Sequence, residues 1–219
     1  MNDTLYADRR DGGRKLAQQF AAYADQSDVV VLGLPRGGVP VAFEVATALD
    51  APLDVFLVRK LGVPGHRELA MGAIASGGVC VLNDDVVRSL GISEPTIERI
   101  TDQEQQELKR RESAYRGDAP PPDVQGRTAI LVDDGLATGA GMKAAVDALK
   151  ARKPSRIVVA VPVAPPETCA EFKTEADEVV CAATPRLFMG VGAWYRDFSQ
   201  TTDSEVKTLL QKANGGTSD

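Results

Sequence analysis

One stretch of the sequence decides the fold: Ala129-Ile130-Leu131-Val132-Asp133-Asp134-Gly135-Leu136-Ala137-Thr138-Gly139-Ala140-Gly141-Met142. Its first four residues predict a buried strand that ends in two carboxylates. A glycine-rich turn then leads into a helix on which Met142, Val146 and Leu149 share one face. Ligands of open parallel sheets bind beyond the carboxyl ends of the strands. The order of strand, acidic pair, turn and helix therefore predicts an anion-binding loop in an α/β domain.

The rest of the chain repeats this alternation of short Val/Ile/Leu runs and amphipathic stretches. The pattern predicts a central parallel sheet of about five strands flanked by helices. We expect strands near residues 28–34, 53–59, 127–133, 156–162 and 178–182. We expect helices near residues 4–24, 38–49, 139–152 and 166–174.

Two segments interrupt the alternation. Residues 69–82 predict two short strands around a glycine-rich turn, as in a hairpin. Residues 93–116 predict a long charged helix with i,i+4 ion pairs from Glu107 to Arg111 and from Glu112 to Arg116. Its sparse apolar stripe is Ile97, Ile100, Leu108 and Tyr115. We expect this helix to offer a solvated face or a dimer contact.

The expected organisation is a single domain over residues 1–214. It carries a charged helical insert at about residues 84–118 and a C-terminal hood and helix at about residues 185–213. Thr202 and Glu205 form a capping-box pattern at the start of that last helix. Residues 215–219 are expected to be a disordered tail.

Composition limits the classes of function. With 25 basic and 31 acidic side chains, the net charge of −6 argues against non-specific nucleic-acid binding. The longest apolar runs have the length of strands and the N-terminus lacks a signal-peptide pattern, so we expect a cytoplasmic protein without a membrane segment. The odd number and wide spacing of Cys80, Cys169 and Cys181 predict reduced, buried thiols rather than a disulfide framework or a zinc site.

The quoted loop suits a ribose 5-phosphate. Residues 138–141 can turn backbone amides towards an anion, and Thr138 adds a hydroxyl donor. Asp133 and Asp134 come before that cradle and suit sugar hydroxyls. The loop has no Lys-Ser/Thr after its glycines, as a nucleoside-triphosphate loop would, and no glycine triplet follows the first strand, as a dinucleotide fold requires. The alternative interpretation is an ordinary acidic turn between a strand and a helix.

A second anion site is expected after the first strand. Gly37 and Gly38 let the backbone approach a ligand, and Arg36 supplies a cationic fork for phosphate oxygens. Arg59 and Lys60 are expected to end the second strand at the same sheet edge. The alternative interpretation is a tight turn with a solvated arginine.

The segment from Ala129 to Met142 closely resembles the motif with which type I phosphoribosyltransferases bind 5-phosphoribosyl-1-pyrophosphate (PRPP). The resemblance implies that Asp133 and Asp134 hold the ribose 2- and 3-hydroxyls. It implies that the 5-phosphate binds at Ala137, Thr138, Gly139, Ala140 and Gly141. Two positions depart from the family pattern. Gly141 stands where the family usually has Thr or Ser, and Ala137 stands where purine-salvage members often have an aspartate proposed as a base.

The same resemblance implies the remaining contacts. The turn from Gly33 to Pro40 is similar to the family's pyrophosphate loop, so the pyrophosphate would bind to Arg36, Gly37, Arg59, Lys60 and Arg196. Residues 61–69 correspond to a mobile loop with His66 and Arg67, and His66 is a candidate acid or base. Phe188 would stack on the acceptor base. Mg²⁺ would be held mainly by PRPP and water, with Asp133 or Asp134 as the protein ligand.

Nearly the whole chain resembles a group of predicted phosphoribosyltransferases of unassigned acceptor. The shared motifs are Tyr6 to Gly13, the turn at Arg36, Arg59 to Gly62, Glu68 to Ala75, and Tyr195 to Phe198. This implies Mg²⁺-dependent phosphoribosyl transfer from PRPP to a nitrogen acceptor, a nucleobase, in nucleotide metabolism and salvage. Pyrophosphate is released, and the catalytic residues are Asp133, Asp134, Arg36 and Lys60. The partners are PRPP and a small-molecule acceptor, without nucleic acid or membrane, and a homodimer is expected.

Two other classes of function stay open. A non-catalytic regulator that binds PRPP or a nucleotide on the same fold is compatible with the charged helix at 93–116 and the altered loop at Ala137 and Gly141. However, the sequence offers it no DNA-binding motif as an output. A hydrolase of nucleotides or sugar phosphates lacks an evident nucleophile or base.

Overall fold

The computed structural model describes residues 4–117 and 119–215, without the side chains of Arg67 and Glu68. Residues 216–219 of the expected tail lie outside this description. The chain forms a five-stranded parallel sheet in the order β2-β1-β6-β7-β8 and a three-stranded antiparallel sheet in the order β3-β4-β5. The predicted α/β fold with a central parallel sheet is confirmed. Among the described helices, none has both the length and the apolar character to cross a membrane.

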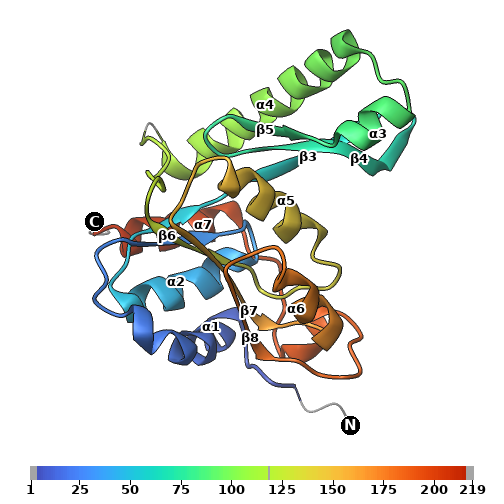
Figure 1. Cartoon of the computed structure of the whole chain (residues 1–219). Helices are drawn as coiled ribbons and strands as arrows, with labels where there is room; N and C mark the ends of the chain where they lie inside the picture. The colour runs from blue at the N-terminus through green and yellow to red at the C-terminus, as the bar shows by residue number, and fades with distance from the viewer. Residues whose placement is uncertain (1–3, 118, 216–219) are drawn as a thin grey trace.

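Alternate residues of the parallel strands face opposite layers. Val29 and Val31 pack in one core with α1 (Arg9–Ala17), α2 (Gly38–Leu49) and α7 (Asp203–Ala213). Figure 1 shows these three helices on the same side of the sheet. Val30 and Leu32 pack in the other core with α5 (Ala140–Lys150) and α6 (Pro166–Phe172). The parallel strands are β1 (Val29–Gly33), β2 (Leu53–Val55), β6 (Thr128–Val132), β7 (Arg156–Val163) and β8 (Glu178–Ala183). Buried residues on both faces are typical of a parallel sheet.

The first helix begins later than predicted. Asp8 caps α1 by accepting a hydrogen bond from the amide of Asp11 at 2.7 Å, which fixes the start of the helix at Arg9. Tyr6 instead bridges to Tyr195, near the short 3-10 helix η2 (Val191–Trp194). After Ala17 the chain continues as the 3-10 helix η1 (Gln18–Tyr23). The prediction of one helix over residues 4–24 is therefore wrong at its N-terminal end, where a tertiary contact holds the chain.

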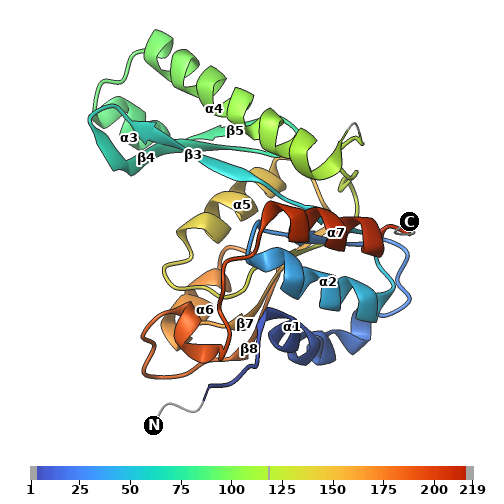
Figure 2. The ribbon, with the colours of Figure 1, turned by 180° about the vertical axis from the view of Figure 1, so that it is seen from behind.

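The second sheet forms an insert between β2 and β6. Its elements are β3 (Val58–Val63), β4 (His66–Ala75), β5 (Val79–Leu82), α3 (Asp84–Ser89) and α4 (Glu94–Arg116). Figures 1 and 2 show this insert projecting from the parallel sheet, with α5 between the two. The hairpin predicted within residues 69–82 is confirmed as β4 and β5.

The prediction of a single strand over residues 53–59 is wrong. β2 ends at Val55, and the chain then enters β3, which pairs with β4. Arg59 and Lys60 therefore lie within the second sheet and do not end a parallel strand. The loop predicted over residues 61–69 is largely strand as well, because Val63 pairs with His66 across a two-residue turn.

The long charged helix is present as α4, and both expected ion pairs form. Arg111 lies 2.8 Å from Glu107, and Arg116 lies 3.0 Å from Glu112. The apolar stripe of α4 packs against the core that contains α2 and α7, with Leu108 fully buried. The helix thus has a solvated face and a packed face.

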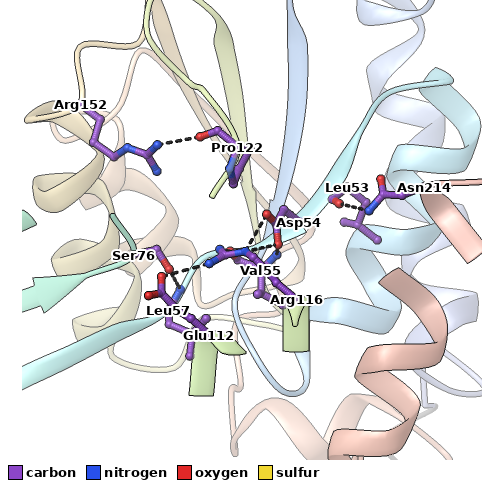
Figure 3. Close-up of polar contacts among 10 residues, drawn as sticks. All are labelled: Leu53, Asp54, Val55, Leu57, Ser76, Glu112, Arg116, Pro122, Arg152 and Asn214. Carbon is purple, nitrogen blue, oxygen red and sulfur yellow. Dashed lines mark hydrogen bonds and ion pairs between the residues drawn. The ribbon is translucent and has the colours of Figure 1, made fainter. Parts of the chain in front are cut away.

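Arg116 joins the end of the insert to the parallel sheet (Figure 3). Its Nε donates to both carboxylate oxygens of Asp54 at 2.8 Å, and its terminal nitrogen donates to the Val55 carbonyl at 2.6 Å. Close by, the amide of Leu57 donates to Oγ of Ser76 at 3.0 Å, and the amide of Ser76 donates to the Leu57 carbonyl at 2.9 Å. The place where the chain leaves β2 and the place where it returns from α4 are therefore tied together.

The prediction of three reduced, buried cysteines is wrong. Cys169 of α6 and Cys181 of β8 form a disulfide, with their Cα atoms 6.6 Å apart, and Cys80 is exposed. The two residues meet because α6 packs beside β8. Their separation of 12 residues along the chain gives no sign of this contact.

We predict that replacing both Cys169 and Cys181 by serine lowers the free energy of unfolding by about 2–3 kcal/mol, because the crosslink restricts the unfolded chain. Urea unfolding without reductant measures the difference. Cys80→Ser is the matched control and should match the wild type. Adding a dithiol should bring the wild type down to the level of the double variant. If the dithiol does not change the urea midpoint of the wild type, the prediction is wrong.

Candidate functional site

Asp133 and Asp134 follow β6 at the carboxyl edge of the parallel sheet. The amide of Leu34, just after β1, donates to the Val132 carbonyl at 2.8 Å. The amide of Asp133 donates to the carbonyl of Ala160 in β7 at 3.3 Å. Both carboxylates are half-buried. The acidic pair thus lies between the ends of two neighbouring strands, where ligands of such sheets bind.

The turn after β1 packs directly on this acidic pair. A Cβ on Gly37 would collide with the carboxylate of Asp134. A Cβ on Gly38 would lie 2.6 Å from the Val132 carbonyl oxygen and 2.8 Å from Cα of Asp133. The peptide bond before Arg36 is cis. The two glycines therefore allow the two predicted anion-binding loops to lie side by side.

Burial, the second carboxylate and Arg9 together set the pKa values of the acidic pair. Burial and the neighbouring carboxylate of Asp134 raise the pKa of Asp133 well above its usual range. Burial also raises the pKa of Asp134, and Arg9 opposes that rise. Two adjacent carboxylates fit a hard divalent cation. Since no group of three or more His, Cys, Asp or Glu in the described ranges could hold a metal, such a cation would also need ligand and water oxygens.

Arg9 is the partner of Asp134, and this contact was not predicted. Its Nε donates to the Asp134 carboxylate at 2.8 Å, and a terminal nitrogen donates to the Ser199 carbonyl at 2.6 Å. Its guanidinium lies 3.8 Å from the ring centroid of Phe198. Arg9 belongs to the shared motif from Tyr6 to Gly13, which could have marked it as a site residue. The prediction of one continuous helix over residues 4–24 gave no reason to place Arg9 beside Asp134.

The loop predicted to bind the 5-phosphate is supported from behind by α6. Gly139 has a φ of 69° and precedes α5, and the ring of Phe172 packs directly against it. Oγ1 of Thr168 donates to the Ala137 carbonyl at 3.1 Å. The exposed residues of this loop are Ala137, Thr138, Ala140 and Gly141. Their open side is the one that a phosphate could approach.

The cations predicted to bind pyrophosphate are spread over several places. Arg36 is exposed and lies 4.0 Å from Asp203. Arg59 forms an ion pair with Glu104 of α4. Lys60 faces the other side of the insert, where it lines a cavity of about 610 Å³ that also reaches Ala140 of the phosphate loop.

The C-terminal and hairpin residues also have defined positions. Arg196 is exposed, and its backbone amide donates to the Tyr6 carbonyl at 2.9 Å. Phe188 is half-buried and stacks on Trp194 with ring centroids 6.4 Å apart. His66 is exposed at the start of β4, and the side chain of Arg67 lies outside the described residues. The structure thus joins the acidic pair, the turn at Arg36 and the phosphate loop, with Lys60 across a cavity.

The sequence signature described as "Phosphoribosyl transferase domain" matches residues 1–90 and 68–185. The chain therefore belongs to the phosphoribosyl transferase family. Proteins with provisional phosphoribosyl transferase names from two strains of Mycobacterium tuberculosis, CDC 1551 / Oshkosh and ATCC 25618 / H37Rv, are each 51% identical over 210 residues. The match covers 96% of this chain and 47% of each relative, so the chain spans about half the length of these curated relatives.

Two further proteins are similar. The crystal structure of TT1426 from Thermus thermophilus has 44% identity and a TM-score of 0.84, over 94% of this chain and 98% of that one. Because 94% of this chain is covered, the similarity to TT1426 includes the insert from β3 to α4. The bifunctional protein PyrR of Roseiflexus sp. (strain RS-1) is 32% identical over 142 residues, which are 61% of this chain and 55% of PyrR.

Proposed function

We propose that this protein catalyses Mg²⁺-dependent transfer of the 5-phosphoribosyl group from PRPP to a nitrogen acceptor, a nucleobase, with release of pyrophosphate. Membership of the phosphoribosyl transferase family supports this proposal. The observation that carries it is the contact between the acidic pair and the turn at Gly37 and Gly38, beside the phosphate loop. In this proposal the protein is a cytoplasmic homodimer of nucleotide salvage.

Each part of the site has a role in this reaction. The backbone amides of residues 138–141 bind the 5-phosphate, and Asp133 and Asp134 accept hydrogen bonds from the ribose hydroxyls. Arg36 and Lys60 offset the charge of the departing pyrophosphate. Bound Mg²⁺, held by PRPP, water and an oxygen of the acidic pair, would supply further positive charge there. The protein thus acts by orientation and electrostatics rather than by covalent chemistry.

In the proposed transfer, the acceptor nitrogen must lose a proton. The bond between C1 of the ribose and the pyrophosphate oxygen breaks, and a bond from C1 to the acceptor nitrogen forms. The proton that this nitrogen loses passes to the released pyrophosphate or to water. Ala137 has no group to take this proton. Phe188 uses one ring face against Trp194, so a planar base would stack on its other face.

The test is acceptor-dependent release of pyrophosphate. Protein, PRPP and Mg²⁺ are incubated with purines, pyrimidines and other nitrogen acceptors, and pyrophosphate is measured. We expect release with at least one acceptor and none after chelation of Mg²⁺. Tight PRPP binding without any such release would reject transfer and support a regulatory PRPP-binding protein, which the loss of functional groups at Ala137 and Gly141 favours.

Replacing Arg9 by alanine should weaken PRPP binding by about tenfold, because a charge-assisted hydrogen bond to Asp134 and its orientation are lost. Calorimetric titration with PRPP measures the effect. Arg10→Ala is the matched control, since Arg10 is half-exposed and pairs with Glu44. Equal affinities of the Arg9 and Arg10 variants would show that Arg9 does not position Asp134 for the ligand.

A further inference from the structure

A polar pocket of about 440 Å³ lies beside the turn after β1. Its charged and polar walls come from three parts of the chain. Arg36 belongs to the turn, and Asp203 is the first residue of α7. The other three, Arg110, Arg111 and Tyr115, belong to α4. Figure 2 shows the C-terminal end of α4 lying above α7, and the two helices are in contact. Three guanidinium groups therefore gather at one pocket.

Two carboxylates, Glu107 and Asp203, contact these arginines, and Glu107 makes the closer contacts. Glu107 accepts two hydrogen bonds from Arg110, at 2.7 and 2.9 Å, and one from Arg111 at 2.8 Å. Asp203 accepts the hydroxyl of Tyr115 at 2.6 Å and lies 4.0 Å from Arg36. Within the described part of the chain, the guanidinium of Arg36 makes no closer polar contact. Three cations thus share two carboxylates, and the Arg36 fork is available to an anion.

The position of the pocket connects it to the proposed ribose site. Arg36 is bonded to Gly37, whose backbone lies against the carboxylate of Asp134. Arg36 lines the pocket, and its neighbour Gly37 contacts the acidic pair, so the pocket and the acidic pair lie on either side of this turn. Of the other cations expected at the pyrophosphate, Arg59 pairs with Glu104, and Lys60 lines the cavity that reaches Ala140 rather than this pocket. Hence α4 supplies the cations that share a pocket with Arg36.

We propose that Arg110 and Arg111 of α4, together with Arg36, bind the terminal phosphate of the pyrophosphate group of PRPP. This inference rests on the proposed function and assigns part of the leaving-group site to the insert. Guanidinium forks match phosphate oxygens in two-point contacts. On binding, Arg110 and Arg111 exchange Glu107 for phosphate. That exchange costs little because both arginines are solvent-exposed in their ion pairs with Glu107.

The experiment compares the binding of three ligands to variants of this chain. Affinities for PRPP, inorganic pyrophosphate and ribose 5-phosphate are measured by calorimetry for the wild type and for the double variant Arg110→Ala/Arg111→Ala. We expect the double variant to bind PRPP and pyrophosphate about tenfold or more weakly, and ribose 5-phosphate within about twofold of the wild type. Arg99→Ala, also on α4, is the matched control. Arg110→Lys/Arg111→Lys should recover part of the loss because the charge is kept.

The outcomes separate this inference from the proposed function. A wild type that binds neither PRPP nor pyrophosphate defeats both. Unchanged pyrophosphate binding by the double variant defeats the α4 assignment and leaves the proposed function standing. An equal loss for ribose 5-phosphate shows general damage to the site and also overturns the assignment. Simultaneous rather than competitive binding of pyrophosphate and PRPP places the anion in a separate site, which overturns it too.

Discussion

Replacing Asp133 by asparagine is expected to lower PRPP-dependent turnover by about a hundredfold or more while the protein stays folded. The amide keeps the shape of the side chain but removes the charge that would accept hydrogen bonds from the ribose and attract Mg²⁺. Stability should not suffer. Burial and Asp134 raise the pKa of Asp133, so ionisation of Asp133 costs folding free energy once the pH exceeds its ordinary pKa of about 4.

The pH dependence of the free energy of unfolding gives a second test of the Asp133→Asn variant. Below pH 4 the wild type and the Asp133→Asn variant should unfold with similar free energies, and as the pH rises towards neutrality the variant should become the more stable of the two. Turnover is followed by pyrophosphate release, and stability by urea unfolding at several pH values. Asp102→Asn, exposed on α4, is the control. Wild-type turnover in the Asp133 variant would remove Asp133 from the catalytic site.

Replacing Arg116 by alanine is expected to lower the free energy of unfolding by about 3–5 kcal/mol. The side chain of Arg116 is 5% exposed and supplies two hydrogen bonds to Asp54, whose pKa burial raises and Arg116 lowers. Removal of the guanidinium leaves the Asp54 carboxylate in the interior without its cation. It also releases the connection between the end of α4 and β2 that Figure 3 shows.

Urea unfolding near pH 7 and near pH 5 measures this loss. The loss should be smaller at the lower pH, because Asp54 without its arginine has a pKa raised further and takes up a proton there. Arg99→Ala is the matched control on the exposed face of the same helix. A loss no larger than that of the control would show that the Arg116 ion pair contributes nothing net to stability.

The sequence predicted the features that depend on local order along the chain. The apolar run before Asp133, the glycines after it and the apolar face at Met142 were enough to place a buried strand, a loop and a helix. Parallel pairing of β1 with β6 then brings the turn at Arg36 to the same edge. These elements follow from periodicity and from the rule that parallel strands share one carboxyl edge.

Features that depend on tertiary contacts were not predictable in the same way. The run from Val55 to Val58 is continuously apolar, so it does not reveal that the chain leaves one sheet at Val55 and enters another at Val58. The paired hydrogen bonds between Leu57 and Ser76 mark that change. The contact of Arg9 with Asp134 was missed for a similar reason, since the position of Arg9 depends on the cap at Asp8 and on the pairing of Tyr6 with Tyr195.

The short helix α6 contacts the loop that begins at Ala137 and also carries one cysteine of the disulfide. Cys169 follows Thr168, whose hydroxyl holds the Ala137 carbonyl, and Cys181 anchors this cysteine to β8. Two electrons and two protons from a dithiol would convert the bond to two thiols and remove the covalent link between α6 and β8. The loop would then have more conformations to lose when a phosphate binds. If the loop binds phosphate as proposed, its affinity for phosphate would then differ between the oxidised and the reduced state of Cys169 and Cys181.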